Sequence, residues 1–557
     1  MRRGIILAIA TGGALLGGTR AHASSYTIIT SAMTQAWDGS CSLLEAINAS
    51  NTLAADHECA AGTGVDDITL SGGTYTTTVP LGINNTVTIA GTGTSVIAAN
   101  FATTQYDTLF SVGGHLTIDN VTVRNDTNNA NIFVTGISVW DTASITSNDR
   151  LRVTGFTWCG IYLQNAELSL DHARIDHNTN LYPDPVWNHG AGIWVNNPDG
   201  TIPQGFTLLH SSIVFNQAAG NGGGLYFGAN GGSHLQYNTY SDNSAARGGG
   251  IYIATNSPGY FESYHQTIGR NTASVSGGGV EEHHMASELA FYSSVIANNT
   301  APTGANMVRN ASGGLAQDNI WGAGVTSANL GCTTSWTCSH NTFGADAKFG
   351  PTMTMGGAYY SQEMLPLLKG SPAVDFATTI GNESLDARGM SGNQDGDNSG
   401  SAGVDAGAFE KNLVWQTEEN LEFFSSSGDL VNIDVGGGYS GGLGRRLDSN
   451  ANNDYVKYVI PIAEAGTYDI TVKFKRASNG GKFFVGFASS QNGTYTELPS
   501  EQDCYSANTT FPAAVSLGSL TFNAAGKFYV RFRVSGQTAG STGRVLFQDY
   551  VKVRKTN

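Results

Sequence analysis

The sequence predicts an all-β protein: a right-handed, single-stranded parallel β-helix followed by a C-terminal β-sandwich of the jelly-roll type. Three observations predict this fold. Glycine accounts for 72 of 557 residues and charged residues for only 13%, a composition typical of short strands joined by tight turns. A glycine-rich motif recurs at a nearly constant interval. The repeat fades after about residue 300, and beyond residue 415 alternating strands such as 455–461 and 467–475 indicate a sandwich with one buried face.

The repeat consists of two markers that stay in phase. The last glycine of the motif falls at Gly160, Gly192, Gly224, Gly250 and Gly279, at intervals of 32, 32, 26 and 29 residues. An asparagine follows a short strand at Asn178, Asn216, Asn243, Asn271 and Asn299. Such phasing indicates stacked coils of about 25 to 30 residues, in which glycines allow tight turns and asparagines hydrogen-bond between coils.

Period-two alternation assigns the side chains after each glycine to two faces. The inward set is Ile161, Ile193, Leu225, Ile251 and Val280, and the outward set is Tyr162, Trp194, Tyr226, Tyr252 and Glu281. Rings spaced by one coil, about 4.8 Å, suit stacking on the sugars of an extended polysaccharide. The alternative is a ladder that only stabilises neighbouring coils. Trp187 and His189 belong to the longest coil insertion, 179–190, which we expect to form one wall of a cleft.

Ionisable residues interrupt the outward row at Glu281, Glu282 and His283. Alternation places Glu281 and His283 on the aromatic face, whereas Glu282 points inward and needs a buried partner or a bulge. A carboxylate and an imidazole beside sugar-stacking rings fit general acid-base cleavage. Glu281 with Asp242 would supply the two carboxyls of a glycosidase, with His283 tuning protonation. A solvated coil edge is the alternative interpretation.

The N-terminus predicts export. Arg2 and Arg3 precede an apolar run, and Ala21 to Ala23 provide a cleavage site, so we expect a signal peptide over 1–23, a β-helix domain over 24–410 and a β-sandwich over 411–557. We expect no membrane span and a secreted monomer. The β-helix domain carries 10 Lys+Arg against 31 Asp+Glu, or −21, whereas 411–557 carries 15 against 13, or +2. An acidic body argues against nucleic acid, which requires basic residues at its phosphates.

An exported chain with six cysteines is expected to form disulfides. The short separations predict the pairs Cys41–Cys59 and Cys332–Cys338. Cys159 and Cys504 fall in different predicted domains, so we expect both to be unpaired.

Two motifs carry a family resemblance. The segment 41–48, CSLLEAIN, followed by Cys59, resembles the CSLREA-type motif of bacterial secreted β-helix proteins, with Leu44 in place of the usual arginine. Segments 370–375, 386–389 and 405–410 (GSPAVD, DARG and DAGAFE) resemble the terminal signature of the same group. The resemblance implies a pectate-lyase-like β-helix and leaves the activity open, because this fold hosts several activities. Segments 454–458, 464–468 and 549–551 resemble family 6-like carbohydrate-binding modules.

Asp395, Asp397 and the more distant Asp405 alternate with small residues around Gly396, as in a calcium loop, although the final glutamate of an EF-hand is absent. A polar, glycine-rich turn is the alternative. Together these features predict a secreted polysaccharide-degrading enzyme that binds its glycan along the β-helix, with hydrolysis favoured over β-elimination and calcium as the only expected cofactor. The alternative is a non-catalytic, glycan-binding adhesin or matrix protein.

Overall fold

The computed structural model describes residues 24–102, 106–127, 132–196, 205–229, 232–254, 260–283, 288–309, 314–328, 330, 336–354, 362–377, 385–390, 394–399, 401–417, 421–426 and 428–556. The predicted signal peptide, 1–23, and the predicted disulfide partner Cys332 lie outside these residues. Among the described residues, no helix is both long enough and apolar enough to cross a membrane.

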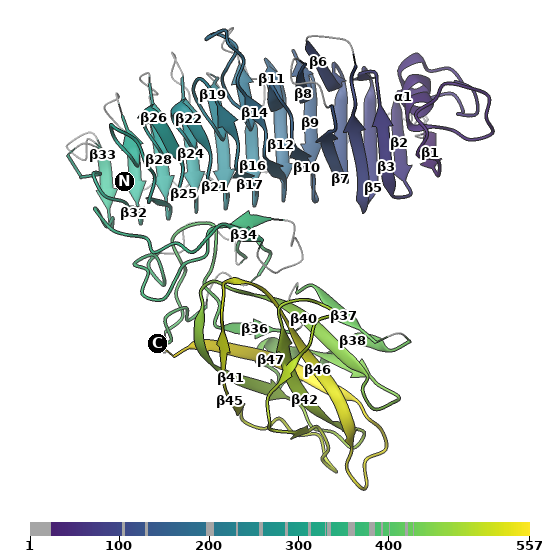
Figure 1. Cartoon of the computed structure of the whole chain (residues 1–557), viewed down its shortest axis with the longest axis vertical. Helices are drawn as coiled ribbons and strands as arrows, with labels where there is room; N and C mark the ends of the chain where they lie inside the picture. The colour runs from purple at the N-terminus through teal and green to yellow at the C-terminus, as the bar shows by residue number, and fades with distance from the viewer. Residues whose placement is uncertain are drawn as a thin grey trace, which may run out of the picture.

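The chain forms a parallel β-helix followed by a β-sandwich, which confirms the predicted fold class (Figure 1). One face of the helix is a nine-stranded parallel sheet: β4 (Leu81–Ile83), β6 (Tyr106–Val112), β8 (Phe133–Trp140), β11 (Cys159–Gln164), β15 (Ile193–Asn196), β19 (Leu225–Gly228), β23 (Ile251–Ile253), β27 (Val280–Glu282) and β30 (Met307–Val308). A short parallel sheet borders it: β14 (Thr179–Asn180), β18 (Gln217–Ala218), β22 (Ser244–Arg247) and β26 (Thr272–Ser276).

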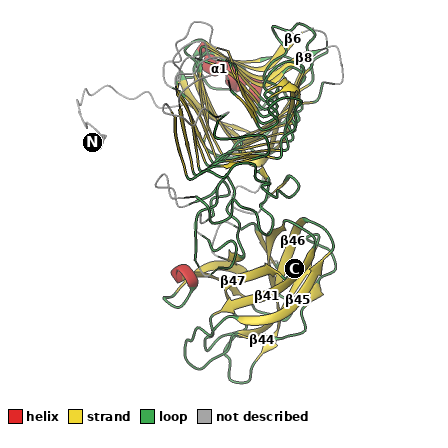
Figure 2. Ribbon diagram, turned by 90° about the vertical axis from the view of Figure 1, so that its left-hand side faces the viewer, coloured by secondary structure: helices red, strands yellow, loops and turns green. Residues whose placement is uncertain are grey.

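The remaining coil strands form one bent parallel sheet: β1 (Ser24–Ile28), β2 (Val65–Leu70), β3 (Gly73–Thr77), β5 (Thr86–Ala99), β7 (His115–Asn125), β9 (Ser144–Ser147), β10 (Arg152–Thr154), β12 (Glu167–Asp171), β13 (Arg174–Asp176), β16 (Phe206–Leu209), β17 (Ser212–Val214), β20 (Ser233–Gln236), β21 (Thr239–Ser241), β24 (Tyr260–Tyr264), β25 (Thr267–Gly269), β28 (Glu288–Tyr292), β29 (Val295–Ala297), β31 (Gly314–Gln317), β32 (Ile320–Trp321) and β33 (Trp336–Ser339). The view along the stack shows these faces enclosing a common interior (Figure 2).

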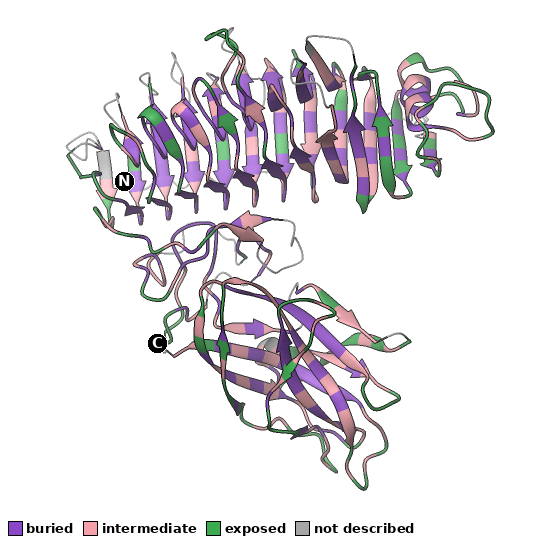
Figure 3. Ribbon diagram, in the orientation of Figure 1, coloured by how far each residue is buried: buried purple, intermediate pink, exposed green. Residues whose placement is uncertain are grey.

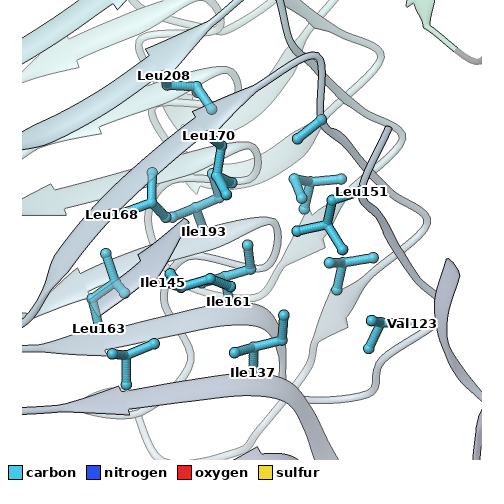
Figure 4. Packing of buried hydrophobic residues seen from close by; sticks show 14 of the residues in the cluster. Val123, Ile137, Ile145, Leu151, Ile161, Leu163, Leu168, Leu170, Ile193 and Leu208 are labelled. Carbon is cyan, nitrogen blue, oxygen red and sulfur yellow. The ribbon is translucent and has the colours of Figure 1, made fainter. Parts of the chain in front are cut away.

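The interior of the helix is apolar. Ile161, Ile193, Leu225, Ile251 and Val280 are all fully buried, as predicted. Burial alternates along many of the strands (Figure 3), and the inward side chains of successive coils pack together (Figure 4). Burial of apolar surface at about 25 cal/mol per Å² is the main force that stacks the coils.

The two sequence markers have separate structural reasons. Side-chain amides join Asn178, Asn216, Asn243, Asn271 and Asn299 in one buried ladder, with 3.0 Å between each Nδ2 and the next Oδ1. Within the motif, the first glycine has positive φ, as at Gly222 (71°), whereas the last one is needed for space. A Cβ at Gly224 would lie 2.7 Å from the Gly250 carbonyl oxygen.

The CSLLEA segment caps the N-terminal end of the helix. It forms α1 (Leu43–Thr52), whose Ser42 and Glu45 make a reciprocal capping box. The Cys41–Cys59 disulfide, present as predicted, joins the start of α1 to the loop that follows it. Cys338 is also disulfide-bonded, and Cys159 and Cys504 are free and buried, as expected.

The SPAVD, DARG and DAGAFE segments meet in one buried cluster beside the helix. Arg388 pairs with Asp386 at 2.5 Å and donates to the Glu410 carbonyl oxygen at 2.6 Å. The Gly407 amide donates to the Ser293 carbonyl oxygen at 2.7 Å, which attaches the cluster to the bent sheet. A small hairpin, β34 (Met353–Thr354) and β35 (Glu363–Met364), lies in the same region.

The sandwich consists of two antiparallel sheets. The first contains β36 (Val414–Gln416), β38 (Leu430–Val435), β39 (Leu443–Asp448), β41 (Gly466–Phe474), β45 (Val515–Phe522) and β47 (Leu546–Lys555). The second contains β37 (Phe423–Ser425), β40 (Tyr455–Ile462), β42 (Gly481–Ala488), β43 (Thr496–Glu497), β44 (Gln502–Asp503) and β46 (Gly526–Gln537). A short 3₁₀ turn, η1, spans Ser440–Gly442.

Candidate functional site

The predicted row of side chains lies in register on the nine-stranded sheet. Tyr162, Trp194, Tyr226, Tyr252 and Glu281 are direct neighbours on β11, β15, β19, β23 and β27. Ring centroids are 5.2, 6.1 and 5.4 Å apart along the four aromatic residues. The coil spacing read from the sequence therefore positions these residues correctly, and we call the four rings the aromatic row.

The expectation that this row is exposed is wrong. Tyr162, Trp194 and Tyr252 are only 3 to 4% exposed and Glu281 is 1% exposed, whereas Tyr226 is half-buried. The rings point away from the helix interior, but neighbouring side chains cover them. Deep burial suits a ladder that stabilises adjacent coils, so the accessible part of this surface must come from other residues.

Three tryptophans form the margin of the row. The sequence pattern did not single out Trp140 or Trp158, and it assigned Trp187 only to the long insertion. Trp140, at the end of β8, is 39% exposed and contacts Tyr162 with 5.3 Å between centroids. Trp158 is half-buried and lies 6.4 Å from both Tyr162 and Trp187. Trp187 is 39% exposed and lies 5.9 Å from Trp194. We call Trp140, Trp158 and Trp187 the tryptophan margin.

The insertion carrying Trp187 and His189 is held against the sheet by hydrogen bonds. Asn180 donates to the carbonyl oxygens of Trp187 and His189 at 3.1 and 2.7 Å, and Trp158 Nε1 donates to Trp187 at 2.9 Å. The His189 ring stacks on Tyr226 at 4.8 Å. Burial lowers the pKa of His189 to about 4, so its neutral Nδ1 accepts a hydrogen bond from the Asn221 amide at 3.0 Å.

The carboxylates proposed for catalysis are all engaged in ion pairs. Glu281 accepts from Arg247 at 2.8 Å and from Ser276 at 2.6 Å. Glu282 pairs with Arg309 at 2.8 Å, and both side chains are almost completely buried. Arg309 is therefore the buried partner that we expected for an inward-pointing glutamate. Each acid is therefore held by an arginine and not presented to an incoming substrate.

The structure does not bring Asp242 to the aromatic row. Asp242 follows β21 of the bent sheet, where it pairs with Arg270 at 3.0 Å and accepts from Thr352. Glu281 lies on the nine-stranded sheet. The predicted pairing of Asp242 with Glu281 is thus wrong, because the two residues belong to different sheets of the β-helix. His283 is exposed and stacks on Tyr252 at 5.8 Å.

A second column lies at the corner of the bent sheet. His172, His210, Tyr237 and His265 all have positive φ, and their rings stack at 4.8, 5.5 and 4.5 Å. Asp171 bridges the first two, with Oδ1 at 2.8 Å from His172 Nδ1 and 2.9 Å from His210 Nδ1. Burial opposes ionisation of Asp171, but these two hydrogen bonds outweigh it and lower the pKa of the carboxyl. Hydrogen bonding and stacking account for this column.

The predicted calcium ligands fall into two groups that share Asp375. Asp395 and Asp397 have carboxylate oxygens within 4.8 Å of one in Asp375, whereas Asp405 groups with Asp375 and Glu410. Asp405 is buried, and both its oxygens accept backbone amides, from Asp375 and Lys411 at 2.7 Å. The ligand set expected from the sequence is therefore divided, and calcium stays a prediction for the Asp375, Asp395 and Asp397 group.

No family model matches the chain, and no curated protein matches it. Among solved structures it is similar to a xanthan lyase from Paenibacillus, with 20% identity and a TM-score of 0.23, over 29% of this chain and 16% of that one. A GH26-CBM35 mannanase from Podospora anserina shows 17% identity and a TM-score of 0.17 over 25% and 28%. A carbohydrate-binding module from Cellvibrio mixtus lichenase 5A shows 14% identity and a TM-score of 0.17, over 26% of this chain and 97% of that one.

The chain thus spans less than a third of the length of the first two structures. Similarity at this level assigns neither a family nor a substrate.

Proposed function

We propose that this protein is exported and binds an extended polysaccharide along its β-helix, over the tryptophan margin and the accessible edges of Tyr226, His189 and His283. The observation that carries the proposal is the cluster of large exposed rings on one face of the nine-stranded sheet. Trp140 and Trp187 are each 39% exposed although they lie beside apolar rings that could have covered them. Exposed aromatic patches of this kind mark binding surfaces.

The geometry of the row supports an elongated ligand. Ring contacts run without a break from Trp140 through Tyr162, Trp194, Tyr226 and Tyr252 to His283. These residues come from successive coils, so the buried row runs along the helix axis and the exposed rings beside it are spread along the same direction. The apolar faces of sugar rings can stack on the exposed rings Trp140, Trp187 and His283, and the buried ladder fixes these rings before binding.

Export is supported by the signal-like N-terminus and by the Cys41–Cys59 disulfide, because disulfides persist in oxidising compartments. The β-sandwich is proposed as a second glycan-binding unit, in line with its resemblance to carbohydrate-binding modules.

Cleavage of the bound glycan is the second candidate function. It is favoured by Glu281, which continues the aromatic row directly after Tyr252, and by the exposed His283 next to it. Binding is preferred because the carboxylates of Glu281, Glu282 and Asp242 are all held by arginines.

Binding is tested by affinity electrophoresis of the mature protein against neutral and acidic polysaccharides. Trp187→Ala and Trp140→Ala should each weaken retention by about tenfold, the effect of losing one stacked ring worth roughly 1 to 2 kcal/mol. The matched control is Trp37→Ala, because Trp37 is 78% exposed but lies near the N-terminal cap. Equal retention of all three variants would contradict the proposal.

Cleavage is tested on the polysaccharides that are retained, by assaying new reducing ends and the absorbance of unsaturated uronates. If the second candidate is right, Glu281→Gln abolishes product formation and leaves retention unchanged. A retained polysaccharide that yields no product identifies the protein as a binder only.

A further inference from the structure

A cavity of about 530 Å³ lies between the segment that follows the β-helix and the sandwich. Its walls come from 367–370, 396–398 and 409–415 on one side and from the ends of β40, β41 and β47 on the other. This volume lies in the range of small-ligand sites. The cavity is separate from the aromatic row, because none of its lining residues belongs to the nine-stranded sheet.

Four cations, Lys369, Lys411, Arg554 and Lys555, and three carboxylates, Asp397, Glu464 and Asp469, line the cavity. Glu464 pairs with Lys555 at 2.5 Å, and Asp469 pairs with Arg554 at 2.8 Å. Among the residues that the structure describes, Lys369 Nζ donates only to the Thr556 carbonyl oxygen, at 3.3 Å. The fourth cation, Lys411, makes no side-chain hydrogen bond or ion pair with any residue that the structure describes.

Lys411 is half-buried, so its ammonium group is partly withdrawn from water. Burial lowers the pKa of this lysine, although the charges of Asp405, Glu464 and Asp397 act against the effect. A partly desolvated ammonium group gains from an anionic partner that supplies direct hydrogen bonds. Lys369 lines the same cavity, and its positive charge acts on Lys411.

The rest of the wall suits a sugar ring. Phe409, Trp415 and Tyr468 line the cavity together with the Asp397 carboxylate, which can accept hydrogen bonds from sugar hydroxyls, and Asn398. Apolar walls with a few polar groups are typical of small-ligand sites, and a pyranose has both an apolar face and hydroxyl groups. An inorganic anion would leave the aromatic wall without a partner.

We propose that this cavity binds a single uronic acid residue, with its carboxylate on Lys411 and Lys369 and its ring against the aromatic wall. The charge of −21 over residues 24 to 410 disfavours a dense polyanion. The ligand is therefore an isolated uronate, such as a side group or chain end on a largely neutral polysaccharide. This inference does not depend on binding at the tryptophan margin.

The test is ligand-observed NMR titration of the full chain with methyl glucuronide and methyl galacturonide. The corresponding methyl glucoside and methyl galactoside serve as neutral probes, which differ from them only at carbon 6. At least one uronide should bind at least about tenfold more tightly than its neutral counterpart, because a charge-assisted hydrogen bond to a carboxylate is lost in the neutral sugar.

Lys411→Gln should weaken uronide binding by about tenfold or more, whereas Lys411→Arg should restore most of it. Lys482→Gln is the matched control, since Lys482 pairs with Glu501 at 3.6 Å on the sandwich outside the cavity. Thermal unfolding of each variant shows whether it folds, and Lys369→Gln gives a second test at a residue on the same wall.

Equal affinity for uronides and neutral glycosides, absence of uronide binding, or equal competition by acetate would each overturn the proposal. Trp187→Ala should leave uronide binding in the cavity unchanged. Failure at the aromatic surface and failure at the cavity are therefore distinguishable.

Discussion

The guanidinium carbon of Arg388 lies 4.2 Å from the centroid of the Phe409 ring. The two residues belong to different terminal motifs, lie 21 residues apart in the sequence, and are both buried. Arg388 also pairs with Asp386 and donates to Asn412 at 2.5 Å. This one side chain therefore joins the DARG and DAGAFE segments at the point where the β-helix gives way to the sandwich.

Arg388→Met should lower the free energy of unfolding by about 3 to 5 kcal/mol, because it leaves Asp386 as a buried carboxylate without its cation. The measurement is guanidinium chloride unfolding followed by circular dichroism. Arg446→Met is the control: Arg446 pairs with Asp448 at 2.8 Å in a partly exposed position, where such pairs contribute about 0 to 1 kcal/mol. Similar losses for both variants would contradict the assignment.

Asn243→Ala should lower the free energy of unfolding by about 3 kcal/mol. The Asn243 side chain accepts two hydrogen bonds from Asn216 and donates to the Ile213 carbonyl oxygen at 2.8 Å. Each buried group that loses its partner costs about 1 to 3 kcal/mol. Asn341→Ala, at a more exposed position outside this ladder where the side chain accepts from Asn319, should cost clearly less. Thermal unfolding of both variants gives the comparison, and equal costs would count against burial as the cause.

The pH dependence of stability should show the effect of Asp405 and Glu410. Burial raises the pKa of Asp405 to about 7 and also raises the pKa of Glu410. An unfolded aspartate titrates near about 4, so the folded state keeps protons that the unfolded chain has lost. The contribution of these groups to stability is therefore present at low pH and is lost as pH rises through about 7.

Asp405→Asn should flatten this decline, and Asp67→Asn, at an exposed position, should leave it unchanged. The measurement is the free energy of unfolding at several pH values between about 4 and 8. An unchanged slope in Asp405→Asn would show that the carboxyl is already ionised in the folded protein.

Calcium, if it binds at Asp375, Asp395 and Asp397, should raise the melting temperature in proportion to the logarithm of its concentration above the dissociation constant. Asp397→Asn should abolish this shift, and magnesium should produce a smaller one, because it demands stricter octahedral geometry. Differential scanning calorimetry with calcium and then with excess chelator provides the readout. If neither calcium nor chelator changes the melting temperature, the loop does not bind calcium.

Periodicity made the architecture predictable. Residues such as Tyr162 and Trp194 repeat at the coil interval, so their adjacency follows from the sequence, as does the asparagine ladder. The exposure of these residues could not be predicted from the repeat, because it depends on side chains outside the strand motif. Trp158 directly precedes the motif, and Trp187 lies in an insertion of unique length; both lie beside rings that alternation alone had placed in solvent.

The sequence contains a feature that could have shown that Asp242 does not lie beside Glu281. Asp242 stands immediately before the ladder residue Asn243, whereas Glu281 stands two residues after the motif glycine Gly279. The two markers belong to different corners of the coil, so residues tied to different markers face different directions. The arginine partners were not predictable, because Arg247 and Arg309 lie 34 and 27 residues from the acids they bind.

The asparagine ladder makes each coil a template for the next one. Asn243 receives the same pair of donors from Asn216 that Asn271 receives from Asn243. A whole coil can therefore be duplicated or removed between two ladder positions without leaving a donor unmatched. The length of the molecule is thus adjustable in steps of one coil.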